Sequence, residues 1–528
     1  QMIDEVHHHS ILGAFRGSQP IDKTQLANVL TSMGQVCADH PEIESLDINP
    51  LIARNDGSLV AVDALIEVGR QHTEQADQTQ NGFTPTQKHF DALFNPRAIV
   101  VIGASSHPGK FGFVSLHNAL ANNFKGQVFA TNLQQENILG VQTVADLAEL
   151  PVGEIDLAFF CTPASSNEAL LKQCSQLGIS SAFIASAGYR ESGEAGEVAE
   201  ASLLKLANSL GMLIAGPNGQ GVVSTPASLC LQIVAPYPPQ GGISVASQSG
   251  NFVSSFLNYA KQSGVGIARA ISAGNATQVS VENFLNYFAS DDETKVALTY
   301  IENVGNGESL LRAMRNITAV KPLVVLKGGA TAAGSKAAQS HTGAMASNDR
   351  VFLGSTRSSG AIKVSSVEEA FDAAATFATQ PLPRGKRVAV LTTVGGWGVV
   401  TADSIARDGV LDLIDLSDDL MSQLSALLPP RWSRNNPIDC AGGETRDTVT
   451  EIMDIVAGHD SIDAVIFLGI GIQSNQAKMM RAGGFYPDHG LERIVAYHEK
   501  QDERYAITAR EVSAKHGKPI LIATELAV

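Results

Sequence analysis

The sequence has few cysteines, and no two of them form a Cys-x-x-Cys pair. They are Cys37, Cys161, Cys174, Cys230 and Cys440. This scattered spacing excludes the disulfide framework of a small secreted protein and predicts a reducing compartment. The sequence also lacks an apolar run near the roughly 18 residues that span a bilayer, and it has no charged-then-apolar leader. We therefore expect a cytoplasmic protein with no membrane partner.

Positive charge is also scarce. The chain has 37 Lys and Arg residues against 53 Asp and Glu residues, which gives a net charge of −16. Nucleic acid backbones are held by an excess of Lys and Arg, so this balance argues against a nucleic-acid partner. An anionic ligand must instead be bound locally, by helix N-termini and backbone amides. The 48 glycines fit a fold with many tight turns between strands and helices.

The 528 residues are enough for roughly three to four domains. Residues 71–90 are polar, rich in Gln and Thr and almost free of aliphatic side chains, which is typical of an exposed linker. Beyond the linker, apolar runs alternate with amphipathic helical patterns, which predicts parallel sheets covered by helices on both faces. This pattern restarts twice. We expect an α/β protein with a segment at 1–70 and doubly wound domains at 91–232, 233–380 and 384–528.

The strands that we expect are short and apolar. They cover residues 99–103, 156–161, 181–186, 212–216, 243–247, 296–302, 323–327, 387–393, 463–470 and 519–524. In open parallel sheets, ligands bind at the carboxyl ends of the strands. The residues that follow these strands are therefore the candidates for chemistry.

A histidine lies in a loop of small residues, Ser340-His341-Thr342-Gly343-Ala344, after the strand that ends at Lys327. A neutral imidazole is nucleophilic near neutral pH, so a histidine can accept a phosphoryl group and release it again. Small neighbours would let it swing between a donor and an acceptor. An ordinary loop histidine is the competing interpretation, and the rest of the chain favours the phosphoryl carrier.

A glycine-rich loop, Gly103-Ala104-Ser105-Ser106-His107-Pro108-Gly109-Lys110-Phe111-Gly112, leads into a helix that we expect from about Val114. Glycines let the backbone approach a pyrophosphate, and a helix N-terminus supplies amides and partial positive charge. The spacing differs from the dinucleotide pattern G-x-G-x-x-G. The loop predicts a nucleotide-type phosphate site, with a purely structural turn as the alternative.

Two further candidates follow strands of the next domain. Ser247-Gln248-Ser249-Gly250-Asn251 lies between a strand and a helix, and its serines and amides suit a phosphate. N-capping by Ser249 alone would give the same pattern. Glu302 ends the next strand, and its carboxylate could accept a hydrogen bond from one imidazole nitrogen and leave the other free to attack phosphorus. A solvated charge at a strand end is the alternative there.

Before the linker, two short strands joined by the turn Asn55-Asp56-Gly57 would bring Asn49 and Asp63 together. Hard oxygen ligands of this kind suit Mg²⁺ carried by a nucleotide. Two polar residues in a hairpin are more often structural, so the pair marks a candidate and no more.

Taken together, these segments resemble the NDP-forming acyl-CoA synthetases, the superfamily that includes succinyl-CoA synthetase and ADP-forming acetate-CoA ligase. The most specific piece is KAAQSHTGAMA at 336–346, which is similar to the family's phosphohistidine loop, followed by SQSG at 247–250 and TYIEN around Glu302. GASSHPGKFG is similar to the CoA-binding entry, and LDINPLI with AVDALI resembles the end of an ATP-grasp domain. The resemblance covers essentially the whole chain.

The resemblance implies a Rossmann-like CoA-binding domain followed by two flavodoxin-like doubly wound domains, preceded by the C-terminal remnant of an ATP-grasp domain. It implies an enzyme, often a homo-oligomer, that converts a small carboxylic acid, CoA and ATP to acyl-CoA, ADP and phosphate through acyl phosphate and phosphohistidine. The implied site residues are His341 and Glu302 for catalysis; Ser247, Ser249, Gly250 and Asn251 for phosphate; Gly103, Ser105, Ser106, Pro108, Gly109, Lys110, Gly112, Thr162, Pro163 and Asn218 for CoA; and Asn49 and Asp63 for Mg²⁺.

The chain departs from the family pattern in several places. Gly219 stands where cysteine commonly follows Gly-Pro-Asn, Thr131-Asn132-Leu133 stands where Val-Asn-Pro is usual, and Trp397 is bulkier than expected. These departures bear on the acyl pocket, the CoA nucleotide contacts and the substrate size. Only the tail of an ATP-grasp domain precedes the linker, so we expect an N-terminally truncated chain. The end at Val528, just after a strand, likewise predicts a missing closing helix.

Two other functions stay open at this point. The CoA-binding regulatory part of a protein acetyltransferase fusion would carry these domains without ligase activity, but such fusions often lack the histidine, and this chain keeps His341 and Glu302. A nicotinamide oxidoreductase would need an acidic ribose ligand after the second strand, and residues 128–132 contain none. No sequence motif identifies the carboxylic acid substrate, because the shape of the pocket decides substrate specificity.

Overall fold

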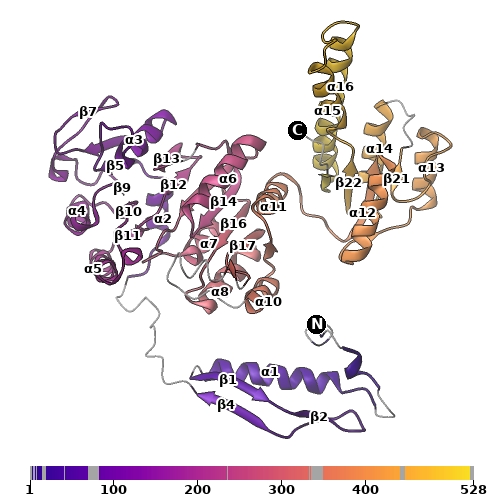
Figure 1. The fold of residues 1–528 in the computed structure, drawn as a ribbon, viewed down its shortest axis with the longest axis horizontal. Helices are drawn as coiled ribbons and strands as arrows, with labels where there is room; N and C mark the ends of the chain where they lie inside the picture. Colours follow the sequence, from indigo (N-terminus) through magenta and orange to yellow (C-terminus); the bar gives the residue numbers. More distant parts are fainter. Residues whose placement is uncertain are drawn as a thin grey trace. The chain divides into compact units, whose positions relative to one another are not determined.

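The computed structural model describes residues 3, 6, 9–14, 19–40, 42–68, 83–234, 236–331, 333–334, 349–440 and 446–523. The chain forms two compact units, Gln1–Thr84 and Pro85–Val528 (Figure 1). Within the described ranges, no helix combines the length and the apolar composition needed to cross a membrane.

The first unit consists of a short 3-10 helix, one α-helix and two antiparallel strand pairs: η1 (His9–Leu12), α1 (Lys23–Asp39), β1 (Ile43–Ile48), β2 (Leu51–Ala53), β3 (Leu59–Ala61) and β4 (Ala64–Val68). The Asp22 carboxylate caps α1 by accepting hydrogen bonds from the amides of Thr24 and Gln25. β1 pairs with β4, and β2 with β3, so the expected hairpin is present.

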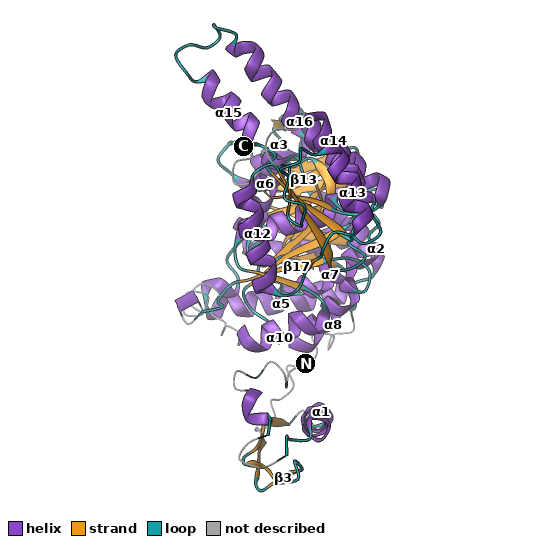
Figure 2. Cartoon of the chain, turned by 90° about the vertical axis from the view of Figure 1, so that its right-hand side faces the viewer, coloured by secondary structure: helices purple, strands orange, loops and turns teal. Residues whose placement is uncertain are grey.

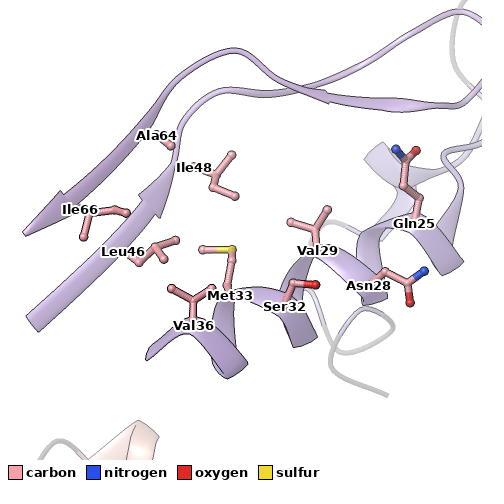
Figure 3. Close-up of a pocket in the computed structure, with 10 residues that line it drawn as sticks. All are labelled: Gln25, Asn28, Val29, Ser32, Met33, Val36, Leu46, Ile48, Ala64 and Ile66. Carbon is pink, nitrogen blue, oxygen red and sulfur yellow. The ribbon is translucent and has the colours of Figure 1, made fainter. Parts of the chain in front are cut away.

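An apolar groove of about 460 Å³ runs between α1 and the β1–β4 pair. Figure 3 shows Val29, Met33 and Val36 of α1 facing Leu46 and Ile66 of the strands. No residue of α1 in the described part of the chain is buried. The groove is therefore an incompletely covered hydrophobic core, and its lining lacks the charged groups that a nucleotide would need.

The second unit opens with a five-stranded parallel sheet in the order β11-β10-β9-β5-β6. Its strands are β5 (Ala98–Ile102), β6 (Gln127–Thr131), β9 (Leu157–Phe160), β10 (Ser181–Ile184) and β11 (Leu213–Ala215). The other elements here are α2 (Gln87–Phe94), α3 (Phe111–Ala121), the hairpin β7 (Asn137–Ile138) and β8 (Val141–Gln142), η3 (Leu147–Glu149), α4 (Ala164–Gln176), η4 (Arg190–Ser192) and α5 (Glu194–Leu210). Every residue of β5, β9, β10 and β11 is buried, as expected of strands covered on both faces.

A seven-stranded sheet follows, in the order β13-β12-β15-β14-β16-β17-β18. Its strands are β12 (Gly221–Ser224), β13 (Leu229–Gln232), β14 (Gln240–Ser247), β15 (Ile267–Ser272), β16 (Val296–Ile301), β17 (Leu323–Lys327) and β18 (Ile362–Val364). Its helices are α6 (Gly250–Ser263), α7 (Val281–Ser290), α8 (Gly307–Thr318), α10 (Asp349–Ser359) and α11 (Val367–Thr379).

The strands β12 and β13 lie within the range 91–232 that the sequence pattern assigns to the first domain. Their hydrogen bonds place them in the seven-stranded sheet instead, because β12 pairs antiparallel with both β13 and β15. An apolar run shows that a strand forms, but it does not show which sheet the strand joins. The chain therefore passes from one sheet to the next at the turn before β12, earlier than residue 232.

The two sheets share one hydrophobic core, to which α2 contributes. Phe90 and Phe94 of α2 stack on Tyr287 of α7, with ring centroids 5.4 and 5.2 Å apart. Both phenylalanines also meet Phe284 edge to face. Such aromatic pairs add specific geometry to the burial of apolar area. The two sheets are therefore held in one fixed arrangement.

A buried ion pair lies in the same region. Arg269 of β15 is 2% exposed, and its guanidinium lies 3.2 Å from the Asp291 carboxylate. It also donates to the side chains of Asn95 and Ser224. A charge removed from water needs such a full set of partners. Since Asn95 directly follows α2, the arginine ties this helix to the second sheet.

The last part of the chain has its own sheet, in the order β20-β19-β22-β23, with β21 also pairing with β19. Its elements are β19 (Arg387–Thr392), α12 (Gly395–Asp408), β20 (Asp412–Leu413), α13 (Asp418–Leu427), β21 (Ile438–Asp439), α14 (Arg446–Gly458), β22 (Ala464–Leu468), α15 (Ile472–Arg481), α16 (Leu491–His516) and β23 (Ile520–Ala523). Figure 2 shows α15 and α16 as a helical hairpin. All the expected strands are present, with ends shifted by a few residues.

Replacing Arg269 tests the role of the buried ion pair in stability. We expect Arg269→Met to lower the free energy of unfolding by about 3 kcal/mol, because Asp291 would keep a buried, uncompensated charge. The matched control is Arg312→Met, which breaks an exposed pair with Glu308 and should cost less than about 0.5 kcal/mol. Urea unfolding measures both, and equal losses would contradict the assignment.

Candidate active site at the carboxyl ends of two sheets

The expected site residues of the second unit follow strands β5, β9, β11, β14 and β16. Parallel strands place their carboxyl ends at one edge of a sheet, so each sheet collects its candidate residues at one edge. The turn 216–220 connects the two edges. His341 lies outside the described residues.

Two glycines bring the loop after β5 against the start of α3. Gly103 has a φ of +83°, and a Cβ there would lie 2.9 Å from the Thr162 side chain and 3.3 Å from the backbone of Cys161. A Cβ on Gly112 would lie 2.1 Å from the carbonyl oxygen of Gly103. Only hydrogen fits at these positions. The first turn of α3 therefore packs directly on the strand end, as a backbone anion site requires.

The rest of this loop is exposed and ordered by local hydrogen bonds. The Ser105 hydroxyl accepts from the amide of His107, and Nδ1 of His107 accepts from the amide of Gly109, both at 3.1 Å. Helix α3 begins at Phe111, earlier than the expected Val114, and its N-cap carries no side-chain hydrogen bond within the described structure. The exposed residues of the loop are Ser106, His107, Pro108, Gly109, Lys110 and Phe111.

Thr162 and Pro163 follow β9 and start α4. The Thr162 hydroxyl donates to Asn167 at 2.8 Å, and the Asn167 amide donates to the hydroxyls of Ser186 and Tyr189 at 2.9 and 2.8 Å. Asn167 is fully buried. Burial raises the pKa of Tyr189, so its hydroxyl stays protonated. The network fixes the ends of β9 and β10 beside the glycine loop.

The turn Gly216-Pro217-Asn218-Gly219-Gln220 crosses from the first sheet to the second. The Gly216–Pro217 bond is cis and Asn218 has a φ of +60°. A Cβ on Gly219 would lie 2.6 Å from the ring of Phe183 and 2.8 Å from the carbonyl oxygen of Ser272. The position where the resemblance led us to expect cysteine therefore has no room for a side chain in this backbone.

Gln220 ties this turn to helix α6. Its side-chain Nε2 donates to Oδ1 of Asn251 at 2.9 Å, and its side-chain Oε1 accepts from the Ser254 hydroxyl at 2.7 Å. A Cβ on Gly250 would lie 2.3 Å from the Gln220 side chain. The turn therefore lies directly against the first turn of α6.

The serines at the start of α6 are ordered by each other. The Ser247 hydroxyl donates to the carbonyl of Ser249 at 2.7 Å and accepts from its amide at 3.1 Å. Ser249 is the N-cap residue, yet in the described structure its side chain caps no amide of α6. Capping alone therefore does not explain this serine. Its hydroxyl lies with the amides of Gly250 and Asn251 at the helix start, where the partial positive charge of a helix favours anions.

Glu302 lies beside this helix start because β14 and β16 are neighbouring parallel strands. The Gln248 side chain accepts from the amides of Glu302 and Asn303 at 2.7 and 2.9 Å. Burial, and then the nearby Glu302 carboxylate, to which it hydrogen-bonds, raise the pKa of Tyr300. Phe252 of α6 stacks on Tyr300 with ring centroids 3.8 Å apart. The structure thus brings Glu302 and the start of α6 together.

Asn275, in the loop after β15, is held by carboxylates from η4 and α5. Its Nδ2 donates to Glu191 at 2.6 Å and to Glu200 at 2.8 Å. Arg190 lies 3.6 Å from Glu200 and donates to the carbonyl of Asn275. Both carboxylates accept hydrogen bonds from the NH₂ group of Asn275. Its Oδ1 therefore faces the side-chain Nδ2 of Asn218, at 3.4 Å. No local sequence pattern predicts this network, which joins the two sheets.

In the first unit, Asn49 and Asp63 are neighbours, with the Asn49 amide donating to the Asp63 carbonyl at 3.2 Å. Both side chains are exposed, and Asp63 Oδ1 accepts from the Ala64 amide at 2.9 Å. The described residues contain no group of three or more His, Cys, Asp or Glu that could hold a metal. These two oxygen donors fit Mg²⁺ only where nucleotide phosphates and water complete its shell.

Two residues beside the last sheet, Trp397 of α12 and Asn436 before β21, have structural roles. Trp397 packs against the hydrophobic core beside β19 and so covers the sheet. Oδ1 of the Asn436 side chain accepts from the backbone amide of Val390, and its Nδ2 donates to the carbonyls of Val388 and Ile414. These bonds join β19 to the chain after β20. Asn436 thus orders the backbone at the start of β21.

Four families match the chain in succession. They are described as ATP-grasp domain at residues 1–68, CoA binding domain at 97–225, succinyl-CoA ligase like flavodoxin domain at 240–377, and ligase-CoA domain at 388–471. Their order is the one that the sequence motifs predict.

Two curated relatives are ligases. The chain is 32% identical over 377 residues to subunit alpha of acetate–CoA ligase (ADP-forming) II from Pyrococcus furiosus, which covers 71% of this chain and 81% of that subunit. It is 33% identical over 379 residues to acetate–CoA ligase (ADP-forming) I from Archaeoglobus fulgidus, which covers 71% of this chain and 54% of that protein. The chain thus spans most of the Pyrococcus furiosus alpha subunit and about half of the Archaeoglobus fulgidus ligase.

A solved structure is also similar. It is the dinucleotide forming acetyl-coenzyme A synthetase 1 of Ca. Korarchaeum cryptofilum in complex with phosphate and ADP. The TM-score is 0.69 and the identity 27%, over 81% of this chain and 97% of that chain.

Glu191→Gln tests the carboxylate contacts of Asn275 through the pH dependence of stability. Burial opposes ionisation, but hydrogen bonds from Asn275, Tyr189 and Gly188 outweigh it and hold the pKa of Glu191 below the usual 4.5. A depressed pKa adds stability above the unfolded value, and this stability is lost as pH falls through the folded value. We expect the variant to unfold at lower urea concentration than wild type near neutral pH, with a difference that shrinks as the pH falls below 4.5 and through the lowered pKa of Glu191.

The matched control for this experiment is Glu308→Gln, at an exposed pair with Arg312. It should change the urea midpoint little at any pH. A Glu191→Gln difference that stays constant from neutral to acid pH would contradict the ionised contact.

Proposed function

The chain belongs to the NDP-forming acyl-CoA synthetase family, and we propose that it takes part in converting a small carboxylic acid, CoA and ATP to acyl-CoA, ADP and phosphate. One observation carries the proposal. The turn 216–220 follows β11 at the carboxyl edge of the first sheet and packs against the start of α6, and the glycine loop after β5 lies at that same edge of the first sheet. A CoA bound at the glycine loop would deliver its thiol toward an acyl phosphate held at the start of α6.

The step at this junction is attack of the CoA thiol on the acyl phosphate. The thiol loses its proton, a carbon–sulfur bond forms, the bond from the acyl carbon to the phosphate oxygen breaks, and inorganic phosphate leaves. Ser249 and the amides of Gly250 and Asn251 would hold the phosphate before and after this step, since hydrogen bonds to oxygen atoms that gain charge stabilise the transition state. Asn218, held by Asn275, faces the same junction.

We further propose that His341 carries the phosphoryl group between this junction and a nucleotide site, and that Glu302 accepts a hydrogen bond from its ring. In the synthetic direction the nitrogen–phosphorus bond breaks as the substrate carboxylate takes the phosphoryl group. The support is the position of Glu302 beside the α6 start.

For the nucleotide, we propose that Asn49 and Asp63 contribute ligands to Mg²⁺. The ion would offset the negative charge of the phosphates during transfer. The acetate ligases among the relatives support a small carboxylic acid as the substrate. A cytoplasmic location and a homo-oligomeric state are part of the same proposal.

The reverse reaction tests the histidine without ATP. Acyl-CoA and inorganic phosphate give CoA and acyl phosphate, which can phosphorylate His341 and release the acid. We expect acetyl-CoA and radiolabelled inorganic phosphate together to give a protein label that is lost in acid and stable in base. His341→Asn should abolish the label.

His489→Asn is the matched control, because His489 is exposed and its positive φ of 57° suits asparagine. Glu302→Gln should slow labelling at least about tenfold. The proposal would be contradicted if His341→Asn still became labelled, or if the wild-type protein did not become labelled.

Gly112→Ala tests the CoA loop. The added Cβ would meet the Gly103 carbonyl at 2.1 Å and push α3 away from the strand end. We expect the Kd for CoA, measured by calorimetry, to rise at least about tenfold. Gly354→Ala in α10, where no atom lies within 4 Å of the new Cβ, is the control. Unchanged affinity in Gly112→Ala would contradict this binding loop.

A further inference from the structure

Lys327 is the last residue of β17, which pairs with β16, and Glu302 directly follows β16. Its side chain is buried, with 7% of the residue exposed. The ammonium donates to the carbonyl oxygen of Glu302 at 3.2 Å and to that of Gly328 at 2.5 Å. It also lies 5.5 Å from the centre of the Phe352 ring.

Stability alone does not account for this lysine. Burial lowers its pKa, although Asp349 works against this shift. The nearby Asp349 carboxylate is paired with Lys363 instead, at 3.1 Å. Within the described ranges Lys327 forms no ion pair with a carboxylate, and a buried cation held by carbonyls alone is costly compared with an apolar side chain of the same length.

The two carbonyls that it holds belong to the residues that set the geometry around Glu302. One is the backbone of Glu302 itself. The other is Gly328, where a Cβ would lie 2.5 Å from the Tyr300 hydroxyl and 3.3 Å from Cγ of Glu302. Lys327 therefore pulls together the ends of β16 and β17 at the point where the Glu302 side chain leaves the sheet.

We infer that Lys327 is a positioning residue for phosphoryl transfer. It fixes the backbone of Glu302 and the turn at Gly328, so that the carboxylate keeps its place beside the start of α6, and its positive charge offsets negative charge that a phosphoryl group brings to this edge of the sheet. This inference rests on the proposed function, because it gives Glu302 its role in that reaction.

A lysine near the opposite end of β17 offers a matched control. Lys321 lies just before the amino end of β17, and its ammonium also donates to two backbone carbonyls, those of Phe288 and Asp291. Burial lowers its pKa as well. Lys321 differs from Lys327 in lying at the opposite end of the strand, away from Glu302.

The test compares Lys327→Met with Lys321→Met in the acetyl-CoA-dependent labelling reaction. We expect Lys327→Met to lower the labelling rate at saturating reactants at least about tenfold, with KM for acetyl-CoA within about twofold of wild type. Lys321→Met should label within about twofold of the wild-type rate. Lys327→Arg, which keeps the charge and the donors, should recover part of the lost rate.

Amide hydrogen exchange provides a second measurement that does not depend on activity. Lys327→Met should speed exchange at residues 302–304 and 328–330, and Lys321→Met should not. Equal labelling rates and equal exchange in the two methionine variants would overturn the role of Lys327. Absence of label in wild type would instead reject the proposed function, while the exchange comparison would still decide whether Lys327 positions Glu302.

Discussion

Close backbone contact between two sheets is the constraint on which this site depends. The sheets share a core packed around α2, and the chain crosses between them at Gly216–Gln220. At this crossing several positions have no space for a side chain: Gly219 lies against Phe183 and Ser272, and a Cβ on Gly274 would lie 2.2 Å from the carbonyl oxygen of Pro217. These contacts hold the start of α6 directly against the turn, and the start of α3 lies at the carboxyl edge of the sheet that the turn leaves.

The electrostatics of the site follow from the acidic character of the chain. With a net charge of −16, the protein has no general attraction for phosphates or for CoA. Backbone amides at the starts of α3 and α6 provide local partial positive charge without raising the net charge. Lys327 adds a positive side chain at this edge of the sheet, where it is buried and its hydrogen bonds lead to Glu302 and Gly328. The carboxylates Glu191 and Glu200, by contrast, serve to orient Asn275.

The sequence predicted the parts of this architecture that are local. Apolar runs located the strands, and the segments at 103–112 and 247–251 stand at strand ends as expected, because both strand formation and helix starts depend on neighbours in sequence. The sheet to which β12 and β13 belong was not predictable, since partner choice is set by distant strands. The burial of Arg269 with Asp291, and the Asn275 network, depend on side chains that meet only after the sheets pack. Gln248 could be found from the sequence, because it lies within the SQSG motif. In the structure its side chain accepts a hydrogen bond from the Glu302 amide.

The central claim is that CoA and phosphate bind on opposite sides of the turn Gly216–Gln220. A crystal structure of the chain with CoA and inorganic phosphate tests it most directly. The account predicts the CoA pyrophosphate over residues 103–112, the phosphate ion against Ser249 and the first amides of α6, and the thiol directed across the turn toward that ion. A thiol that points away from the start of α6 would contradict the account.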